Sequence, residues 1–363
     1  MTATVRVGVV GCGLICQWQH LPSLIEHPQA QVACVCDIDP HRRNLAARAT
    51  SAAPVADLDE MLAIGVDAVL IATHDLAHAE LAEVALEHGK HVFVEKPLAL
   101  TVAEAERVAE LAAEAQTVVA VGLQRLHDPA LRQLTSELPA VGRLSLVHLH
   151  DFCHSNESVI SESLPAHLTD RAFMSGRRDF GEAARWMGIL EREFPGFRPE
   201  MADSYRLFVN LVCHDLSVLV AVLGEPTAVE FASISTQRFG VIVLSFGEVT
   251  AVLEFGQTGR KWFDERLRVL GEAGTLEASW ATPFVVGVPT QYVARSMRGT
   301  VDVHETLQFT HRSLFRAELW DFIDRIITPS PPDGSMANAV TVTRWLSKSI
   351  EYDIQRRALA DGG

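Results

Sequence analysis

The chain has 363 residues, of which 48% are hydrophobic, and a formal net charge of −15 at pH 7. This length and composition indicate a globular protein of two domains. The acidic balance argues against nucleic acid or an anionic membrane surface as a partner, and no apolar run is expected to span a bilayer. The N-terminal residues pass directly into a strand, without a basic region or cleavage site, which predicts a cytoplasmic protein.

The first strand, residues 5–10, runs into a glycine-rich turn and then into a helix. Gly11 permits the tight turn, and Gly13 allows a pyrophosphate to approach the backbone at the helix N-terminus. Cys16 occupies the position of the third small residue, where glycine or alanine is usual, and this loosens the match. The preceding strand and the following helix are the context that a dinucleotide-binding turn requires.

The second strand, residues 31–36, ends at Asp37. An acidic residue a little over twenty positions after the glycines is placed to accept hydrogen bonds from both ribose hydroxyls of the adenosine. Its negative charge would oppose a 2′-phosphate, so the sequence favours NAD over NADP. The alternative is that Asp37 only opens the turn at residues 37–40.

Strands and helices continue to alternate over about the first 125 residues, which predicts a doubly wound parallel sheet. Asp75 is expected to cap a helix that ends at Gly89, and Thr101 with Glu104 forms a capping box for the next helix. Further strands are predicted at residues 54–55, 67–73, 91–95 and 117–122.

The strand that begins at residue 91 ends in Glu95-Lys96-Pro97. Lys96 is costly to bury unless it has a function, and Pro97 cannot donate to a sheet ladder, so the strand must stop there. A lysine at the carboxyl end of a parallel strand lies where open α/β sheets bind their ligands. The alternative is a strand end with a solvated lysine.

After Arg125 the pattern changes to that of an α+β domain with an open, largely antiparallel sheet. A long irregular stretch at residues 153–204 is expected to border the substrate pocket, and a helix follows at 206–223. The predicted domains are a Rossmann domain at 1–125 and a substrate-binding and oligomerisation domain at 126–363. Strands are expected at 142–150, 228–235, 241–246, 249–255, 265–270 and 275–278, and closing helices at 314–327 and 336–354.

The cysteines are interpreted as reduced thiols that pack as small hydrophobic side chains. Cys34 and Cys36 resemble a fragment of a metal site, but no second ligand pair follows at the spacing of a zinc site. His148 and His150 share one face of a strand and offer a second metal alternative, although hydrogen bonding to a substrate is the favoured reading. The predicted site therefore contains no metal.

Together these motifs resemble the Gfo/Idh/MocA family of NAD(P)-dependent sugar and cyclitol dehydrogenases over nearly the whole chain, with Glu95-Lys96-Pro97 the most specific part. The resemblance implies a Rossmann domain followed by a domain whose sheet often forms the oligomer interface. It also implies cofactor-binding and substrate-binding positions. These are Leu14, Ile15, Thr73, His74, His78, Glu95 and Gln124 for the cofactor, and Arg125, His150 and Trp186 for the substrate. Trp186 could stack on a sugar face or only anchor its segment.

The resemblance makes Lys96 the residue that contacts the reacting hydroxyl. The family often carries Asp-x-x-x-His on a helix of the second domain, and Asn210 and His214 occupy these positions here. They share one helix face, and histidine has a reference pKa of about 6.5, which suits a general acid or base. Taken without the family, His214 is better explained as a satisfied core histidine.

The leading hypothesis is an NAD-dependent dehydrogenase that acts on a secondary alcohol of a sugar, cyclitol or sugar derivative, as a homodimer or homotetramer. One alternative is a member of the family that retains NAD for redox-assisted glycoside cleavage or epimerisation. Another is a non-catalytic nucleotide-binding sensor, against which the presence of both Lys96 and His214 argues.

Overall fold

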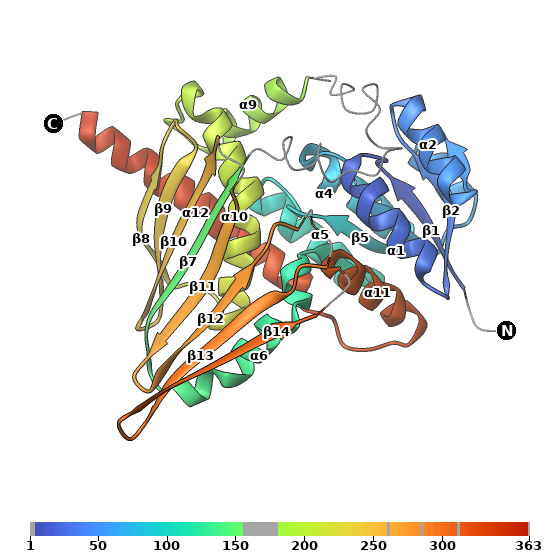
Figure 1. Ribbon diagram of the computed structural model, residues 1–363. Coiled ribbons are helices and arrows are strands. Elements are labelled where there is room, and N and C mark those ends of the chain that lie inside the picture. The colour runs from blue at the N-terminus through green and yellow to red at the C-terminus, as the bar shows by residue number, and fades with distance from the viewer. Residues whose placement is uncertain are drawn as a thin grey trace. The chain divides into compact units, whose positions relative to one another are not determined.

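The structure, a computed structural model, describes residues 4–154, 181–259, 262–283, 285, 287–310 and 313–361 (Figure 1). The chain forms two compact units. Of the described residues, unit 1 contains 4–124, 181–185 and 315–343, and unit 2 contains 125–154, 186–314 and 344–361. The boundary after Gln124 lies beside the one expected from the sequence. The return of residues 315–343 to unit 1 was not expected.

Unit 1 is built on a six-stranded parallel sheet with the order β3-β2-β1-β4-β5-β6. The order reverses beside β1, which is the switch point where doubly wound sheets bind ligands at the carboxyl ends of their strands. The predicted doubly wound parallel sheet is therefore confirmed. Its strands are β1 (Val5–Val10), β2 (Ala30–Cys36), β3 (Ala53–Val55), β4 (Ala68–Ile71), β5 (His91–Glu95) and β6 (Val119–Gly122).

Some helices of unit 1 begin at a side chain that caps them, and others do not. Thr101 and Glu104 form the predicted capping box, and Gly89 has a φ of 64°, as expected for the end of a helix. The predicted cap at Asp75 is wrong, because a short 3₁₀ turn precedes the helix and no side chain caps it. The helical segments are η1 (Cys16–His20), α1 (Leu21–Glu26), α2 (Pro40–Thr50), α3 (Leu58–Ala63), η2 (Asp75–Ala77), α4 (His78–Glu87), α5 (Val102–Ala115) and α11 (Leu314–Ile327).

The core of unit 1 joins the N-terminal sheet to α11, which lies far along the chain. Leu319, Phe322 and Ile323 of α11 are fully buried in the same cluster as strand residues of β1, β4 and β5. The rings of Phe93 on β5 and Phe322 meet edge to face, with their centroids 5.7 Å apart. This helix therefore completes the hydrophobic core of the parallel sheet.

Unit 2 contains an eight-stranded sheet with the order β14-β13-β12-β11-β7-β10-β9-β8. All neighbouring pairs are antiparallel except β7 and β10, so the predicted largely antiparallel sheet is confirmed. The long β13–β14 hairpin (Figure 1) was not predicted. The strands are β7 (Leu144–His154), β8 (Ala228–Ile234), β9 (Phe239–Phe246), β10 (Val249–Thr258), β11 (Asp264–Gly271), β12 (Gly274–Trp280), β13 (Thr290–Arg298) and β14 (Val301–Phe309).

The stretch predicted to be irregular contains helices. Residues 155–180 of it lie outside the described residues, but α9 spans Glu182–Glu193 and α10 begins at Ala202 and ends at Leu223. Trp186, Leu190 and Phe194 are buried at helical spacing, a pattern that the charged residues between them obscured. The other helical segments that include unit 2 residues are η3 (Gln124–His127), α6 (Pro129–Glu137), η4 (Leu138–Val141), η6 (Pro199–Met201) and α12 (Ser335–Asp361).

The helix α10 packs against one face of the unit 2 sheet, where Phe208 meets Phe255 of β10 with ring centroids 5.3 Å apart. By length and composition alone, the segment Pro199–Leu223 is also a weak candidate for a membrane span, which the sequence prediction did not foresee. Among the described residues it is the one such helix, and 56% of its apolar window is buried. Buried core helices of proteins without any membrane span meet the same criteria of length and hydropathy.

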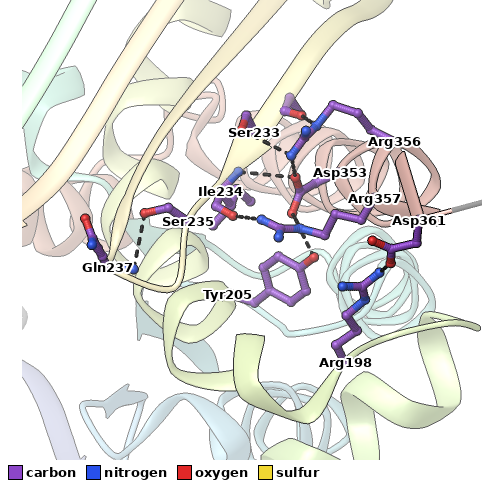
Figure 2. Close-up of polar contacts among 11 residues, drawn as sticks. Arg198, Tyr205, Ser233, Ile234, Ser235, Gln237, Asp353, Arg356, Arg357 and Asp361 are labelled. Atoms are coloured by element: carbon purple, nitrogen blue, oxygen red, sulfur yellow. Dashed lines mark hydrogen bonds and ion pairs between the residues drawn. The ribbon is translucent and has the colours of Figure 1, made fainter. Parts of the chain in front are cut away.

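The C-terminal half of α12 is attached to unit 2 by a buried carboxylate (Figure 2). Asp353 is fully buried and accepts hydrogen bonds from Tyr205 of α10 at 2.9 Å and from the amide of Ile234 at 3.3 Å. It also pairs with Arg356 at 2.7 Å and Arg357 at 2.8 Å. One side chain thus links α12, α10 and the end of β8.

Candidate functional site

The glycine turn after β1 has the geometry that a dinucleotide-binding turn requires. Gly11 has a φ of 90°, and a Cβ on it would lie 2.5 Å from the carbonyl oxygen of Ala72, so no other residue fits there. A Cβ on Gly13 would meet nothing within 4 Å, so the backbone faces open space. Leu14 and Ile15 begin the helix that follows and are half-buried. The turn therefore offers the close backbone approach and the helix start that a pyrophosphate needs.

Asp37 lies at the carboxyl end of β2, next to this turn. Its Oδ2 accepts from the amide of Cys12 at 2.6 Å, and its Oδ1 accepts from the amide of Asp39 at 2.7 Å. The side chain thereby fixes the position of the turn. Because a carboxylate has about four lone-pair sites, it can accept further hydrogen bonds from ribose hydroxyls. Both the predicted role and the alternative of a turn-forming residue fit this geometry.

Glu95 and Lys96 lie at the carboxyl end of β5, two strands from β1. Glu95 is buried, and its Oε1 pairs with Nε2 of His20 at 2.7 Å. Its Oε2 accepts from the backbone amide of Lys96 at 3.1 Å. Glu95 therefore joins the end of η1 to the peptide that carries the lysine. Lys96 is half-buried and takes part in polar interactions.

His78 connects the ends of two neighbouring strands rather than facing open space. It is buried, with Nδ1 2.7 Å from the carbonyl oxygen of Pro97 and Nε2 3.3 Å from that of Thr73. Burial lowers the pKa of His78, which keeps the imidazole neutral, so one ring nitrogen carries the proton and donates. Thr73 and His74 are half-buried in the loop after β4. Gln124 is buried at the end of unit 1, and its amide oxygen has no partner within the described part of the chain.

The predicted acid–base residues Asn210 and His214 lie one turn apart on α10 in unit 2, both half-buried. The amide nitrogen of Asn210 donates to the carbonyl oxygen of Arg206 at 3.1 Å. The carbonyl oxygen of His214 accepts from the hydroxyl of Ser217 at 2.6 Å. Lys96, in contrast, belongs to unit 1.

Arg125 lies in a buried cluster of carboxyl groups in unit 2. It pairs with Glu265, and oxygens of Asp151, Asp215 and Glu265 all lie within 4.8 Å of one another. Burial raises the pKa of Asp151 to about 6 and that of Glu265 to about 8, although Arg125 opposes both shifts. Burial, followed by the other two carboxyls, also raises the pKa of Asp215 well above its ordinary value. Arg125 thus lies inside the unit among acidic groups that sequence reasoning did not single out.

The remaining predicted substrate residues are not brought together with His214. His150 lies on the sheet face opposite to Asp151 and α10, and pairs with Asp264 at 3.0 Å. Its neighbour His148 pairs with Glu254 at 2.8 Å. Trp186 is buried, and its indole N–H donates to the carbonyl oxygen of Ala202 at 3.3 Å. This contact ties α9 to the start of α10, and the stacking role of Trp186 stays a prediction.

All six cysteines are buried and form no disulfide. Burial raises the pKa values of Cys34 and Cys36 to about 11 each, so both remain neutral thiols near pH 7. The Sγ of Cys36 donates to the carbonyl oxygen of Ala56 at 3.4 Å. This placement supports their interpretation as packed thiols.

Residues 5–123 match a family model for oxidoreductases with an NAD-binding Rossmann fold, the Gfo/Idh/MocA model. Curated relatives cover most of the chain. The inositol 2-dehydrogenase 3 of Saccharopolyspora erythraea is 28% identical over 348 residues, which are 93% of this chain and 91% of the relative. The myo-inositol dehydrogenase Hyg17 of Streptomyces leeuwenhoekii is 29% identical over 289 residues, 75% of each chain. The predicted resemblance is confirmed.

Solved structures share the fold at low identity. The 3-ketoreductase KijD10 from Actinomadura kijaniata, in complex with NADP and TDP-benzene, has a TM-score of 0.71 and 19% identity, covering 94% of this chain and 96% of that chain. A putative NADPH-dependent oxidoreductase from Desulfitobacterium hafniense has a TM-score of 0.75 and 16% identity, covering 96% of each chain. These neighbours, one with NADP bound and one named for NADPH, leave the choice between NAD and NADP open.

Proposed function

We propose that the chain transfers a hydride between NAD and a secondary alcohol of a sugar, cyclitol or sugar derivative, because residues 5–123 match the Gfo/Idh/MocA oxidoreductase model and the relatives include inositol dehydrogenases. One observation carries the proposal. The glycine turn, Asp37 and Lys96 lie at the carboxyl ends of β1, β2 and β5, around the switch point of one parallel sheet. Ligands of doubly wound sheets bind at this edge.

The residues of this chain would bind and orient the reactants. The turn at Gly11 and Gly13 would hold the pyrophosphate, and Asp37 would accept from the adenosine ribose. The nicotinamide, when bound, supplies the hydride chemistry. Lys96 would contact the hydroxyl that is oxidised, and His214 would take or return its proton. The relatives named as inositol dehydrogenases support a polyol substrate.

A substrate screen tests this proposal. The purified chain is mixed with NAD or NADP and a panel of cyclitols, sugars and glycosides, and absorbance is followed at about 340 nm, where reduced nicotinamide absorbs. We expect NADH to form with at least one polyol. Glycoside cleavage or epimerisation without accumulated NADH would identify the chain as a member that retains NAD. Cofactor binding without turnover on any substrate would favour the sensor.

The preference for NAD is proposed from Asp37. Asp37→Ala is expected to weaken NAD binding and to narrow the gap between NAD and NADP, because it removes a charged acceptor from the ribose hydroxyls and a repulsive charge from a 2′-phosphate. Titration of both cofactors into the two proteins measures this. Because Asp37 also fixes the turn through Cys12, Asp37→Asn serves as the control that keeps an acceptor oxygen without the charge. A wild-type protein that prefers NADP would contradict the assignment.

The replacement of aspartate by Asn210 has an expected signature in the pH profile. In the variant Asn210→Asp, a negative charge one helical turn from His214 would favour the imidazolium form. Protonation of the base would then begin at higher pH, so the acidic limb of kcat/KM for alcohol oxidation should move to higher pH. Measurement of kcat/KM against pH for both proteins checks this. A limb that stays in place or moves to lower pH means that Asn210 is not electrostatically coupled to the base.

We further propose that the protein is cytoplasmic and assembles with itself through the unit 2 sheet. On the face opposite α10, Phe152 stacks on Trp262 and lies tilted against Phe239, with ring centroids 6.3 and 6.4 Å away. Phe239 and Trp262 are 37% and 48% exposed, and exposed aromatic patches favour association. Light scattering of the wild type and of Trp262→Ser measures whether this face sets the oligomeric state.

A further inference from the structure

Glu318 on α11 is a buried acid that faces the Glu95–His20 pair within unit 1. It is 1% exposed, and neither of its carboxyl oxygens has a hydrogen-bond partner among the described residues. One carboxyl oxygen of Glu318, one of Glu95 and a ring nitrogen of His20 all lie within 4.8 Å of one another. Nδ1 of the fully buried His20 likewise has no partner in the described part of the chain. Three elements thus bring polar groups close together at one buried place.

The surroundings of this point are aromatic. The ring of His20 meets Phe93 and Phe315 edge to face, at centroid distances of 5.5 and 6.0 Å. An ionised Glu318 would be buried without a hydrogen-bond donor among the described residues and would lie beside a second carboxylate. A neutral carboxylic acid avoids both penalties and keeps an O–H group that it can donate.

The pKa shifts of Glu318 and of the neighbouring Glu95 agree with a neutral Glu318. Burial raises the pKa of Glu318 well above its ordinary value, and Glu95 and Asp333 raise it further. Burial also acts to raise the pKa of Glu95, but the hydrogen bond and charge of His20, together with Lys96, lower it overall. Glu95 is therefore the ionised member of the pair of acids, and Glu318 holds the proton.

The polar atoms of Glu318, Glu95 and His20 are close enough to share one hydrogen-bonded group between them. Three atoms within 4.8 Å of one another have a common point at most about 2.8 Å from each, which is the length of a hydrogen bond. One bridging water at such a point, or a small rotation of Glu318, connects its O–H to the Glu95–His20 pair.

We propose that Glu318 is a positioning residue for Lys96, because its proton holds the Glu95 carboxylate in place. The connection is short. Glu95 binds His20 through Oε1 and the backbone amide of Lys96 through Oε2, so a displaced Glu95 moves the peptide that carries the lysine. This inference rests on the proposed function, in which Lys96 contacts the reacting hydroxyl.

The first test compares two substitutions in turnover. Glu318→Gln keeps a neutral donor and acceptor, and we expect it to retain kcat within about threefold, whereas the apolar Glu318→Leu should lose about tenfold or more. The KM for the cofactor should change little in either variant. An equal loss in both variants would mean that Glu318 acts as a charge, and full activity in both would mean that it positions nothing. Either result overturns the proposal.

The second test needs no substrate. The native state holds a proton that the unfolded chain releases above its ordinary glutamate pKa of about 4.5, so raising the pH in this window removes stability. Above about pH 4.5, and until the pH reaches the raised pKa of Glu318 in the folded chain, the folding equilibrium constant of the wild type should fall, relative to that of Glu318→Gln, by up to about tenfold per pH unit. The carboxyl cluster of unit 2 is the same in both proteins and cancels. Equal pH dependence of the two would show that Glu318 does not hold the proton.

The two tests separate this inference from the proposed function. If no polyol is oxidised, the stability comparison still decides whether Glu318 is protonated. If Lys96→Ala abolishes turnover while Glu318→Leu does not change it, the proposed function stands and the positioning role fails. Elemental analysis of the purified wild type gives a further outcome. A stoichiometric divalent metal that Glu318→Gln lacks would overturn the assignment of a proton to this point.

Discussion

Lys96→Ala is expected to lower kcat for polyol oxidation by about a hundredfold or more, the usual contribution of a positioned proton-transfer group. The affinity for the cofactor should change much less, because the glycine turn and Asp37 lie at other strands. Initial rates at saturating cofactor, together with a cofactor titration, separate the two effects.

The same strand offers a matched control for this experiment. Lys90 precedes the amino end of β5, whereas Lys96 follows its carboxyl end. Lys90→Ala removes an identical charge at the edge of the sheet where ligands do not bind, so turnover should remain at the wild-type level. A Lys96→Ala protein with near wild-type turnover would remove this lysine from the mechanism.

Asp353→Ala is expected to lower the free energy of unfolding by about 3–5 kcal/mol, the usual effect of removing one partner from a buried ion pair. Tyr205, Arg356 and Arg357 would all lose the acceptor that they share, as Figure 2 makes plain. Denaturant unfolding of the wild type and the variant, followed by a probe of unit 2, measures the difference.

Two variants from the same region set the scale of this effect. Asp361 pairs with Arg198 near the surface (Figure 2), and an exposed pair contributes at most about 1 kcal/mol, so Asp361→Ala should change little. Tyr205→Phe removes one hydrogen bond and should lower stability by about 1 kcal/mol. If Asp353→Ala is no worse than Asp361→Ala, the buried carboxylate does not hold α12 to the unit.

The sequence predicted those helices and strands whose buried residues follow a regular pattern along a short stretch of the chain. The bounds of β1 and α11 agree with the sequence prediction, because each is an unbroken apolar or amphipathic run with clear ends. The β13–β14 hairpin was missed because its strands are largely exposed and mix charged with apolar residues, so that pairing with β12 determines their structure. An amphipathic pattern also cannot state which sheet a helix covers, as α11 demonstrates.

In the candidate site, too, local sequence patterns identified some residues but not those that tertiary packing brings together. Gly11, Asp37 and Lys96 were found because each stands at the end of a predicted strand, where spacing alone indicates a ligand edge. Glu318 could not be found in this way, since it reaches Glu95 only through the packing of α11 in unit 1. His214 was singled out by resemblance, whereas its neighbour Asp215, fully buried in the carboxyl cluster, has no local signal.

The packing of α11 on the parallel sheet also constrains how the chain is made. The core that surrounds Phe93 lacks Leu319, Phe322 and Ile323 until the ribosome has added about 200 residues beyond Gln124. At about 5–20 residues per second, that interval is about 10–40 s. During it, apolar surface of the first-made sheet is without its final cover, so the nascent chain should depend on holdase chaperones more than a Rossmann domain whose helices all precede residue 125.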